Sequence, residues 1–274
     1  MLSDAIPDIS VVVPTRNSES TLAWTLLSLK SQAGAAVEII AVDSDSTDRT
    51  RTICAAYEVP VINVPAGNMY AAINAGIRRS KAPWVTYLNS DDYVYADSFA
   101  RSLSSARAVA ADIAYGMCDY VDWRGRHIHT FRPAGSGLLA GLFQANVCPF
   151  PQQGSIFTRE VFETAGGFSE DLRLSSDFAL FRIAHRQGFR FCRVPPPSVG
   201  AFRIHPSQLS HSMAELAESE RLTRQQPVSA GAVLRGYLSM AAWKACNLPA
   251  YAERILRAYQ LTGRPKLLRT ISPP

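Results

Sequence analysis

The sequence predicts an α/β protein with a mostly parallel, Rossmann-like sheet that carries helices on both faces. Over the first hundred residues, short β-branched apolar runs alternate with segments of helical periodicity, which is the pattern of βαβ units. Polar residues follow the ends of these runs, as expected at the carboxyl edge of a parallel sheet. Beyond residue 205 the pattern becomes basic and helical, so we expect a C-terminal helical extension over 206–274.

Strands and helices are expected to alternate up to residue 115. Asn17 or Ser18 can cap the first helix, and Asn68 precedes the third. We expect strands at 9–13, 37–42, 59–64, 84–88 and 112–115, with helices near 18–32, 46–57, 70–80 and 97–110.

The rhythm changes after residue 115. Residues 117–131 predict a hairpin turning at Arg124–Gly125, an antiparallel addition to the sheet. We expect an irregular segment at 144–158, helices at 159–165 and 177–187, and a closing strand at 189–194. Ser175 or Ser176 can cap the second of these helices. The chain is again expected to be helical from Met213 onward.

Composition is that of a globular enzyme. The chain has 274 residues, of which 47% are hydrophobic and 19% are charged, which excludes wholesale disorder. Its five scattered cysteines form no C-x-x-C, so neither a disulfide framework nor a zinc site is indicated and a cytoplasmic location is expected. The acidic N-terminus does not resemble a signal peptide, and the longest uncharged run is broken by prolines and glycines.

An acidic stretch follows the run that begins at Trp84. The apolar residues give way to Asn89, Ser90, Asp91 and Asp92. Adjacent carboxylates repel each other unless a cation or a set of donors lies beside them, and hard oxygen ligands suit Mg²⁺ or Mn²⁺. In isolation the stretch is more typical of a solvated acidic turn than of a metal site.

The usual phosphate-binding loops are absent. No G-x-G-x-x-G follows the first strand, and no G-x-x-x-x-G-K-S/T occurs in the chain. Instead, Asp43 ends the second strand and Asp91 and Asp92 follow the fourth. This arrangement favours a nucleotide held through its ribose or base, with its phosphates neutralised by a bound metal.

Six segments carry motifs that recur together in one known family. They are V-V-V-P-T-R-N, T-L-L-S-L-K-S-Q, E-I-I-A-V-D-S-D-S-T-D-R-T, A-I-N-A-G-I, Y-L-N-S-D-D and G-S-I-F-T-R-E-V-F-E-T-A-G-G-F-S-E-D-L-R-L-S-S-D-F-A-L-F-R-I-A. In order and spacing they resemble the inverting family 2 glycosyltransferases of GT-A fold. The resemblance covers residues 9–205 and is closest to bacterial members that build polysaccharide or lipid-linked sugars. It implies a catalytic domain over 1–205, with a nucleotide-sugar half at 1–115 and an acceptor half at 116–205.

The resemblance also implies site residues. Asp177 matches the general base, Asp91 the metal ligand, and His205 a second residue near the metal. The residues implied in nucleotide-sugar binding are Pro14, Thr15, Asn17, Asp43, Asn74, Asn89, Ser90, Asp92 and Arg203. The chain departs from the family at Asn89, where a carboxylate is common, and at Gln152, where relatives often have His.

Together these patterns predict a metal-dependent inverting glycosyltransferase. It would use Mn²⁺ or Mg²⁺ and a nucleotide-diphosphate sugar, most simply a UDP-sugar, and would act on a glycan or lipid-linked saccharide; no nucleic-acid partner is expected. One alternative is a non-catalytic sugar-nucleotide-binding or scaffold subunit. Another is a sugar nucleotidyltransferase, although that class usually has a glycine-rich, arginine-containing loop where this chain has P-T-R-N-S-E-S.

The C-terminal segment is basic. From Val228 to Pro274 there are seven Lys or Arg residues against one acid, Glu253. This excess predicts reversible, peripheral association with an anionic membrane at the inner face of the cell. The alternative is that the apolar stripes of this segment pack against the catalytic domain.

Overall fold

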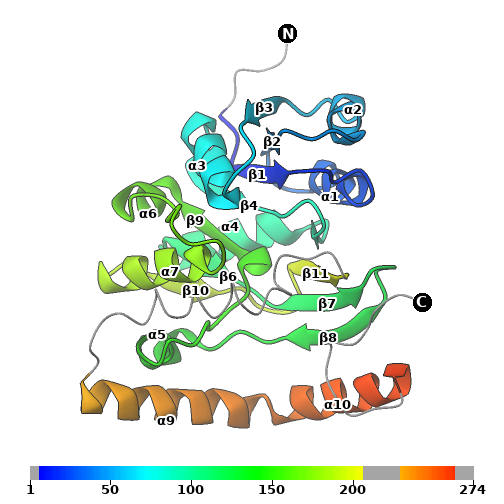
Figure 1. Ribbon diagram of the computed structural model, residues 1–274. Helices are drawn as coiled ribbons and strands as arrows, with labels where there is room; N and C mark the ends of the chain where they lie inside the picture. Colours follow the sequence, from blue (N-terminus) through cyan, green and yellow to red (C-terminus); the bar gives the residue numbers. More distant parts are fainter. Residues whose placement is uncertain (1–5, 206–228, 263–274) are drawn as a thin grey trace.

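The computed structural model describes residues 6–205 and 229–262, and in this part of the chain the strands form two sheets (Figure 1). The main sheet has seven strands and the second sheet four. The strands are β1 (Ile9–Thr15), β2 (Val37–Ser44), β3 (Val61–Val64), β4 (Trp84–Tyr87), β5 (Tyr93–Val94), β6 (Ile113–Tyr115), β7 (Cys118–Asp122), β8 (His127–Phe131), β9 (Ser155–Thr158), β10 (Phe191–Arg193) and β11 (Gly200–Ile204). The helices are α1 (Leu22–Lys30), α2 (Thr50–Ala56), α3 (Met69–Arg79), α4 (Ser98–Ala108), α5 (Leu139–Gln144), α6 (Arg159–Thr164), α7 (Ser176–Arg186), α9 (Ala230–Cys246) and α10 (Leu248–Thr262).

The main sheet is mostly parallel, as predicted. Its order is β10-β6-β9-β4-β1-β2-β3, and β9 pairs antiparallel with both β4 and β6. The prediction that 144–158 is wholly irregular was therefore wrong at its end. The run S-I-F-T is too short to show a periodicity, yet its β-branched and aromatic residues fit a buried strand. Through β9 the two halves of the chain share one sheet.

Helices cover both faces of this sheet, which confirms the predicted architecture. On one face α1, α2 and α4 enclose a core that includes Leu26, Cys54 and Phe99. On the other face α3, α5, α6 and α7 enclose a core rich in aromatic residues, among them Phe157 and Phe181. Alternate residues of β1 and β2 enter the two cores, as the period of a strand requires.

The second sheet contains the predicted hairpin. Strands β7 and β8 pair antiparallel, and β11 then pairs parallel with β7 and antiparallel with β5, giving the order β5-β11-β7-β8. The appendage is therefore completed by strands from two distant parts of the chain. It brings Arg203 and His205 next to the loop that follows β4.

Two helices, α1 and α2, begin four residues later than the sequence predicts. Helix α1 starts at Leu22 with Thr21 at its N-cap, so the prediction that Asn17 or Ser18 caps it was wrong. Asn17 has a φ of 48°, a left-handed conformation that Asn tolerates, and its side chain bonds a neighbouring loop instead. Asn68 is the N-cap of α3, and its side chain accepts a hydrogen bond from the Tyr70 backbone N–H. Of the two residues predicted to cap α7, Ser175 occupies the N-cap position.

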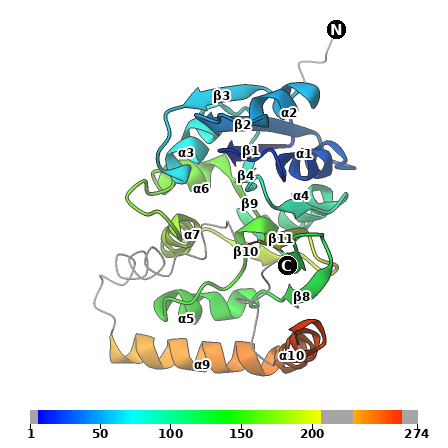
Figure 2. The same cartoon turned by 45° about the vertical axis from the view of Figure 1, so that its right-hand side comes forward.

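The C-terminal extension contains two helices that pack on the acceptor half. Figures 1 and 2 show α9 running alongside α5, at the end of the molecule opposite β3. The remainder of the predicted helix, residues 213–228, lies outside the described residues. Among the described helices, none combines the length and the apolar character that crossing a membrane requires.

Candidate active site

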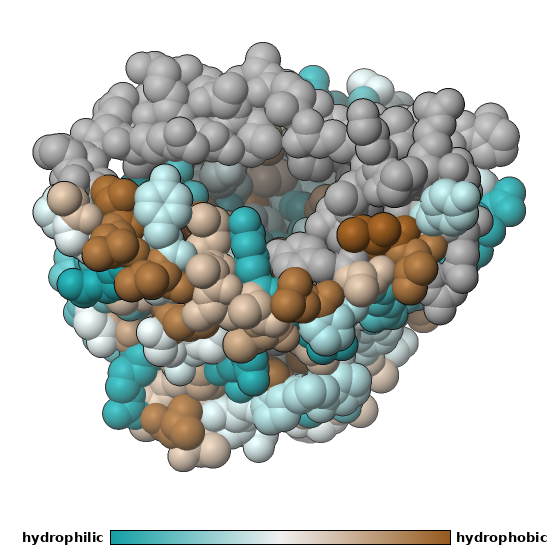
Figure 3. Space-filling model, turned by 90° about the horizontal axis from the view of Figure 1, so that it is seen from below, coloured by the Kyte–Doolittle hydropathy of each residue, from teal (hydrophilic) through white to brown (hydrophobic). Residues whose placement is uncertain are grey.

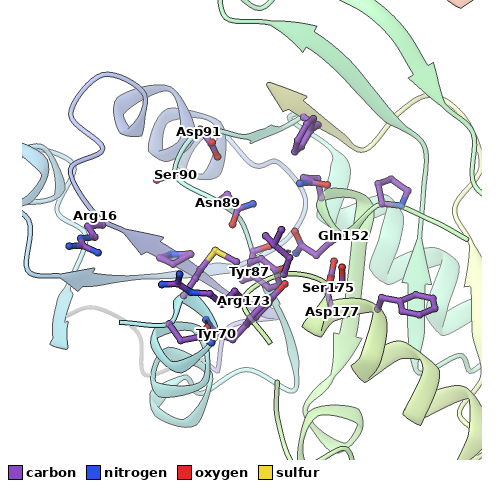
Figure 4. Close-up of a pocket in the computed structure, with 18 of the residues that line it drawn as sticks. Arg16, Tyr70, Tyr87, Asn89, Ser90, Asp91, Gln152, Arg173, Ser175 and Asp177 are labelled. Carbon is purple, nitrogen blue, oxygen red and sulfur yellow. Dashed lines mark hydrogen bonds between the residues drawn. The ribbon is translucent and has the colours of Figure 1, made fainter. Parts of the chain in front are cut away.

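One cavity of about 730 Å³ lies where loops of the nucleotide half face the acceptor half (Figure 4). This volume is typical of small-molecule sites. Of the residues that the sequence predicts for the site, six line it: Pro14, Thr15, Asn89, Ser90, Asp91 and Asp177. In Figure 4, Asp91 and Asp177 lie apart, with Asn89 and Tyr87 between them, and they come from different halves of the chain.

Three loops at the carboxyl ends of β1, β2 and β4 form the nucleotide side of the cavity. The Asn17 side-chain oxygen accepts a hydrogen bond from the Thr47 backbone N–H at 2.9 Å, which joins the first loop to the second. The Ser18 and Ser90 hydroxyl oxygens lie 2.8 Å apart, which joins the first loop to the third. These bonds hold the nucleotide side in shape without a ligand. Asn17 acts within this network and does not line the cavity.

Asp43 lies beneath this rim. Its carboxylate is fully buried and accepts hydrogen bonds from Thr15 at 3.0 Å and from the Arg51 guanidinium at 2.7 Å. Burial raises the pKa of Asp43, but donation by Ser46, Arg51 and Thr15 outweighs it and holds the net pKa below its usual range. The carboxylate is therefore ionised and organises the loops. Its predicted contact with uracil or ribose stays a prediction.

Asp91 and Asp92 have different surroundings although they are adjacent. Asp91 lines the cavity, and its Oδ2 lies 2.8 Å from Nε2 of His205. Asp92 is fully buried and accepts hydrogen bonds from the Gln153 side chain at 2.9 Å and the Arg203 backbone N–H at 3.0 Å. Burial, and then the neighbouring Asp91 charge, raise the pKa of Asp92 well above its usual range. Asp92 therefore positions the loop, whereas Asp91 faces the cavity.

The polar groups around Asp91 fit a divalent cation. Asp91 and His205 offer an oxygen and a nitrogen ligand, and the nearby side-chain oxygen Oδ1 of Asn89 is buried with no hydrogen-bond partner in the described residues. The described part of the chain contains no cluster of three or more His, Cys, Asp or Glu side chains. Mg²⁺ usually takes one or two carboxylates and completes its shell with water and substrate phosphates. The residues present therefore fit a metal shared with a diphosphate.

Two arginines that the sequence reasoning missed also line the cavity, Arg16 and Arg173. Arg16 is exposed and forms no salt bridge within the described residues. A cation at this position can face an anionic ligand. The sequence could have predicted Arg16 as a site residue, because it lies between Thr15 and Asn17 in a loop that the resemblance already assigned to nucleotide binding.

Asp177 lies in the first turn of α7, on the acceptor side of the cavity. Burial raises its pKa, and bonds from the Phe178 backbone N–H and the Tyr70 hydroxyl oppose the increase without cancelling it. The ring of Tyr70 meets that of Tyr87 edge to face with centroids 6.4 Å apart, and their hydroxyls are hydrogen bonded. Tyr70 and Tyr87 both line the cavity. They were missed because each reads in sequence as an ordinary core aromatic.

Gln152 connects the acceptor side to β4. Its side-chain nitrogen donates to the Tyr87 carbonyl at 2.6 Å, and its side-chain oxygen is buried with no partner among the described residues. Because Gln152 lines the cavity, this oxygen can accept a hydrogen bond from a ligand hydroxyl. Gln152 and Gln153 thus contribute to the site from the segment that looked irregular in sequence.

Three of the predicted binding residues, Asn74, Asp92 and Arg203, are buried and do not line the cavity. The Asn74 side chain donates to the Phe168 carbonyl at 2.8 Å and accepts from the Phe168 N–H at 2.9 Å, so it joins α3 to the acceptor half. The Arg203 guanidinium lies over the rings of Trp24 and Tyr93 at 5.8 and 5.7 Å. These positions indicate support of the site from behind its surface.

The fold is α/β, and the cavity has the carboxylate of Asp91 on one side and that of Asp177 on the other. Residues 10–168 match the family model described as glycosyl transferase family 2. The succinoglycan biosynthesis protein ExoO of Rhizobium meliloti is 30% identical over 81% of this chain and 70% of its own length. EpsJ of Bacillus subtilis, an uncharacterised glycosyltransferase, is 25% identical over 80% of this chain and 68% of its own. The chain belongs to glycosyl transferase family 2 and is a glycosyltransferase of bacterial glycan biosynthesis.

Solved structures confirm the GT-A fold. TarS 1–349 of S. aureus in complex with UDP-GlcNAc superimposes with a TM-score of 0.67 over 92% of this chain and 80% of that one, at 17% identity. The mannosyltransferase PcManGT of Pyrobaculum calidifontis, in complex with GDP-Man and Mn²⁺, gives a TM-score of 0.58 over 94% and 86%, also at 17% identity. Membership of the family favours an enzyme over the non-catalytic and nucleotidyltransferase alternatives.

Proposed function

We propose that this glycosyltransferase is a metal-dependent inverting enzyme that transfers a sugar from a UDP-sugar to a hydroxyl group of a glycan or lipid-linked saccharide. The observation that carries the proposal is a single cavity with Asp91 on its nucleotide side and Asp177 on its acceptor side. Inversion by single displacement requires a base for the acceptor hydroxyl and charge neutralisation at the leaving diphosphate, on opposite sides of the transferred sugar.

The nucleotide side carries the groups that a nucleoside diphosphate requires. Thr15 and Pro14 line the wall above the buried Asp43, where a ribose or base would lie. Arg16 and Asp91 face the cavity beyond them. The preference for UDP is supported by the TarS complex with UDP-GlcNAc, which shares this fold.

Asp91, His205 and Asn89 are the residues that would hold Mn²⁺ or Mg²⁺. When bound, the metal supplies positive charge that stabilises the departing diphosphate. The Mn²⁺ in PcManGT, another protein of this fold, supports the proposal.

On the acceptor side, Asp177 accepts the proton of the attacking hydroxyl. The acceptor oxygen forms a bond to the anomeric carbon as the bond from that carbon to the phosphate oxygen breaks, and the electron pair leaves with UDP. Tyr70, which donates to Asp177, fixes the direction of the carboxylate. The buried side-chain oxygen of Gln152 is placed to accept a hydrogen bond from a hydroxyl of the sugar.

The relatives support the proposed acceptor class. ExoO acts in succinoglycan biosynthesis, and a poly(ribitol-phosphate) beta-glucosyltransferase of Bacillus spizizenii is 25% identical over 78% of this chain and 38% of its own length. We propose a growing glycan or lipid-linked saccharide as the acceptor. The enzyme would reach it from the cytoplasmic side, in peripheral contact with the membrane.

Measurement of UDP release tests the donor and the metal together. The purified chain is incubated with UDP-, GDP- and dTDP-sugars, in Mn²⁺ and in EDTA. We expect release from one or more UDP-sugars in Mn²⁺ and almost none in EDTA. Equal release in EDTA contradicts metal dependence, and release from GDP- or dTDP-sugars alone contradicts the choice of UDP.

A further inference from the structure

Helix α9 has two faces of opposite character. The face toward α5 is made of small residues: Gly236 and Ser239 are buried, and a Cβ at Gly236 would lie 2.6 Å from the Ala145 Cβ. At the same face the Trp243 ring N–H donates to the Arg132 carbonyl at 3.1 Å, and its ring packs 5.7 Å from that of Phe131. This face fixes α9 rigidly to the acceptor half.

The opposite face of α9 is apolar and exposed. Leu234, Tyr237 and Leu238 are 60%, 62% and 63% exposed, and their spacing places them on one side of the helix. Helix α10 also exposes apolar side chains, and Figure 3 shows apolar residues in several groups along the underside of the molecule, with hydrophilic residues between them. Of the thirteen large apolar side chains that are exposed among the described residues, eight belong to α9 and α10: Val233, Leu234, Tyr237, Leu238, Leu248, Ile255, Leu256 and Tyr259. Scattered exposed apolar residues are ordinary, whereas a concentration of them on two neighbouring helices indicates an interaction surface.

Cations border this face on both sides. Arg235 and Lys244 are both exposed. They are nine residues apart, and because each residue turns an α-helix by about 100°, they lie about 180° apart around the helix axis. The apolar face lies between them. Residues 230–246 contain no Asp or Glu. A wide apolar face with basic margins and a tyrosine is the pattern of a helix that lies in the interface of a bilayer.

The geometry points to the exposed face of α9 and α10 as a docking surface for an anionic lipid bilayer, with the apolar side chains in the interface and Arg235 and Lys244 against the headgroups. A second copy of the chain suits this face less well. Pairing two copies would bring the same basic margins together without an acidic partner on α9, and juxtaposed like charges oppose association.

Docking in this way orients the enzyme. Figures 1 and 2 both show α9 at the end of the molecule farthest from α2 and β3. The acceptor half therefore lies next to the membrane and the nucleotide half faces the aqueous phase. A membrane-anchored acceptor and a freely diffusing nucleotide sugar would then approach the cavity from different sides. The binding itself requires neither substrate, so it stands or fails independently of the proposed function.

Co-sedimentation of the full chain with vesicles tests the surface. We expect pelleting with phosphatidylglycerol-containing vesicles at low salt, and much less with phosphatidylcholine alone. Leu234→Glu/Leu238→Glu should lower partitioning at least about tenfold, because burying one leucine already gives about that gain. The matched control is Leu27→Glu, which changes an exposed leucine of α1 and should bind like the parent. Arg235→Gln/Lys244→Gln should lower partitioning about fivefold for each cation at low salt, and less at high salt.

Thermal unfolding curves show whether a variant that loses vesicle binding is still folded. The four substituted leucine and basic positions are exposed, so each variant should unfold at the parent's temperature. Equal, negligible pelleting of the parent with both kinds of vesicle overturns the proposal. So does a parent that is dimeric by analytical ultracentrifugation and becomes monomeric in Leu234→Glu/Leu238→Glu without any loss of vesicle binding.

Discussion

The two sides of the cavity are held in place by different interactions. The nucleotide side consists of loops joined by polar bonds, such as Asn17 to Thr47 and Ser18 to Ser90. The acceptor side rests on packed rings: Phe143, Phe150 and Phe181 contact one another or Phe178 with centroids between 4.9 and 6.4 Å apart. The polar loops of the nucleotide side leave polar groups at the cavity surface for a ligand. The packed rings of the acceptor side give the Asp177 carboxylate an apolar environment.

This difference appears in one carboxylate from each side of the cavity, the buried Asp43 and the half-buried Asp177. Asp43, surrounded by donors, has a pKa below its usual range, whereas burial raises that of Asp177. A carboxylate with a lowered pKa is a permanent anion suited to organising loops. One with a raised pKa is a better proton acceptor, as a general base requires.

Removing Asp91 should have the largest effect on the nucleotide side. Asp91→Asn is expected to abolish metal-stimulated turnover and to weaken UDP binding in Mn²⁺, because it removes the carboxylate that faces the ligand. Turnover is titrated against Mn²⁺, and UDP affinity is measured by calorimetry with and without the metal. Full activity of the variant at limiting Mn²⁺ contradicts the metal assignment.

On the acceptor side, kcat should begin to fall at a higher pH than it would if the base were an aspartate of ordinary pKa. The base acts when ionised, and the pKa of Asp177 is raised, so kcat should fall about tenfold per pH unit below a pKa that lies above the usual aspartate value. UDP affinity should change little over the same interval. A kcat that stays level down to the ordinary aspartate pKa contradicts this account.

Tyr70→Phe should have a smaller effect on turnover than the loss of either cavity-lining carboxylate. It removes the hydroxyl that donates to Asp177, so the acid limb of kcat should move to higher pH, and kcat should fall by roughly fivefold, the size of one ordinary hydrogen bond. Tyr93→Phe is a matched control, because Tyr93 does not line the cavity. If both variants give the parent's pH profile, Tyr70 does not position the base.

Asn74→Ala should affect stability and leave UDP affinity unchanged. The substitution leaves the buried N–H and carbonyl of Phe168 without the hydrogen bonds that Asn74 gives them. Each lost bond should lower the free energy of unfolding by about 1–3 kcal/mol. Denaturant unfolding measures the loss, and calorimetry measures UDP affinity. A variant of normal stability that binds UDP weakly would instead restore the predicted role of Asn74 as a ligand of the donor.

The sequence predicted the nucleotide side better than the acceptor side, for a physical reason. A parallel strand brings whatever follows it to one edge of the sheet, so Asp43, Asp91 and Asp92 could be grouped from strand positions alone. The acceptor side depends on long-range pairing of β9, and on Tyr70 and Tyr87 facing a helix that begins about a hundred residues later. Neither has a local signature. Which face of α9 packs inward was likewise set by the complementary shape of α5.

The most direct test of the division between the two sides is Asp177→Asn, assayed for turnover and for UDP affinity in the same preparation. The ionised carboxylate has a raised pKa in the folded state, so it opposes folding at neutral pH and the amide variant should be no less stable. We expect kcat to fall by at least about 10²-fold, the scale of a positioned general base, with UDP affinity within about twofold of the parent. A variant that loses UDP affinity and keeps its turnover would contradict the account.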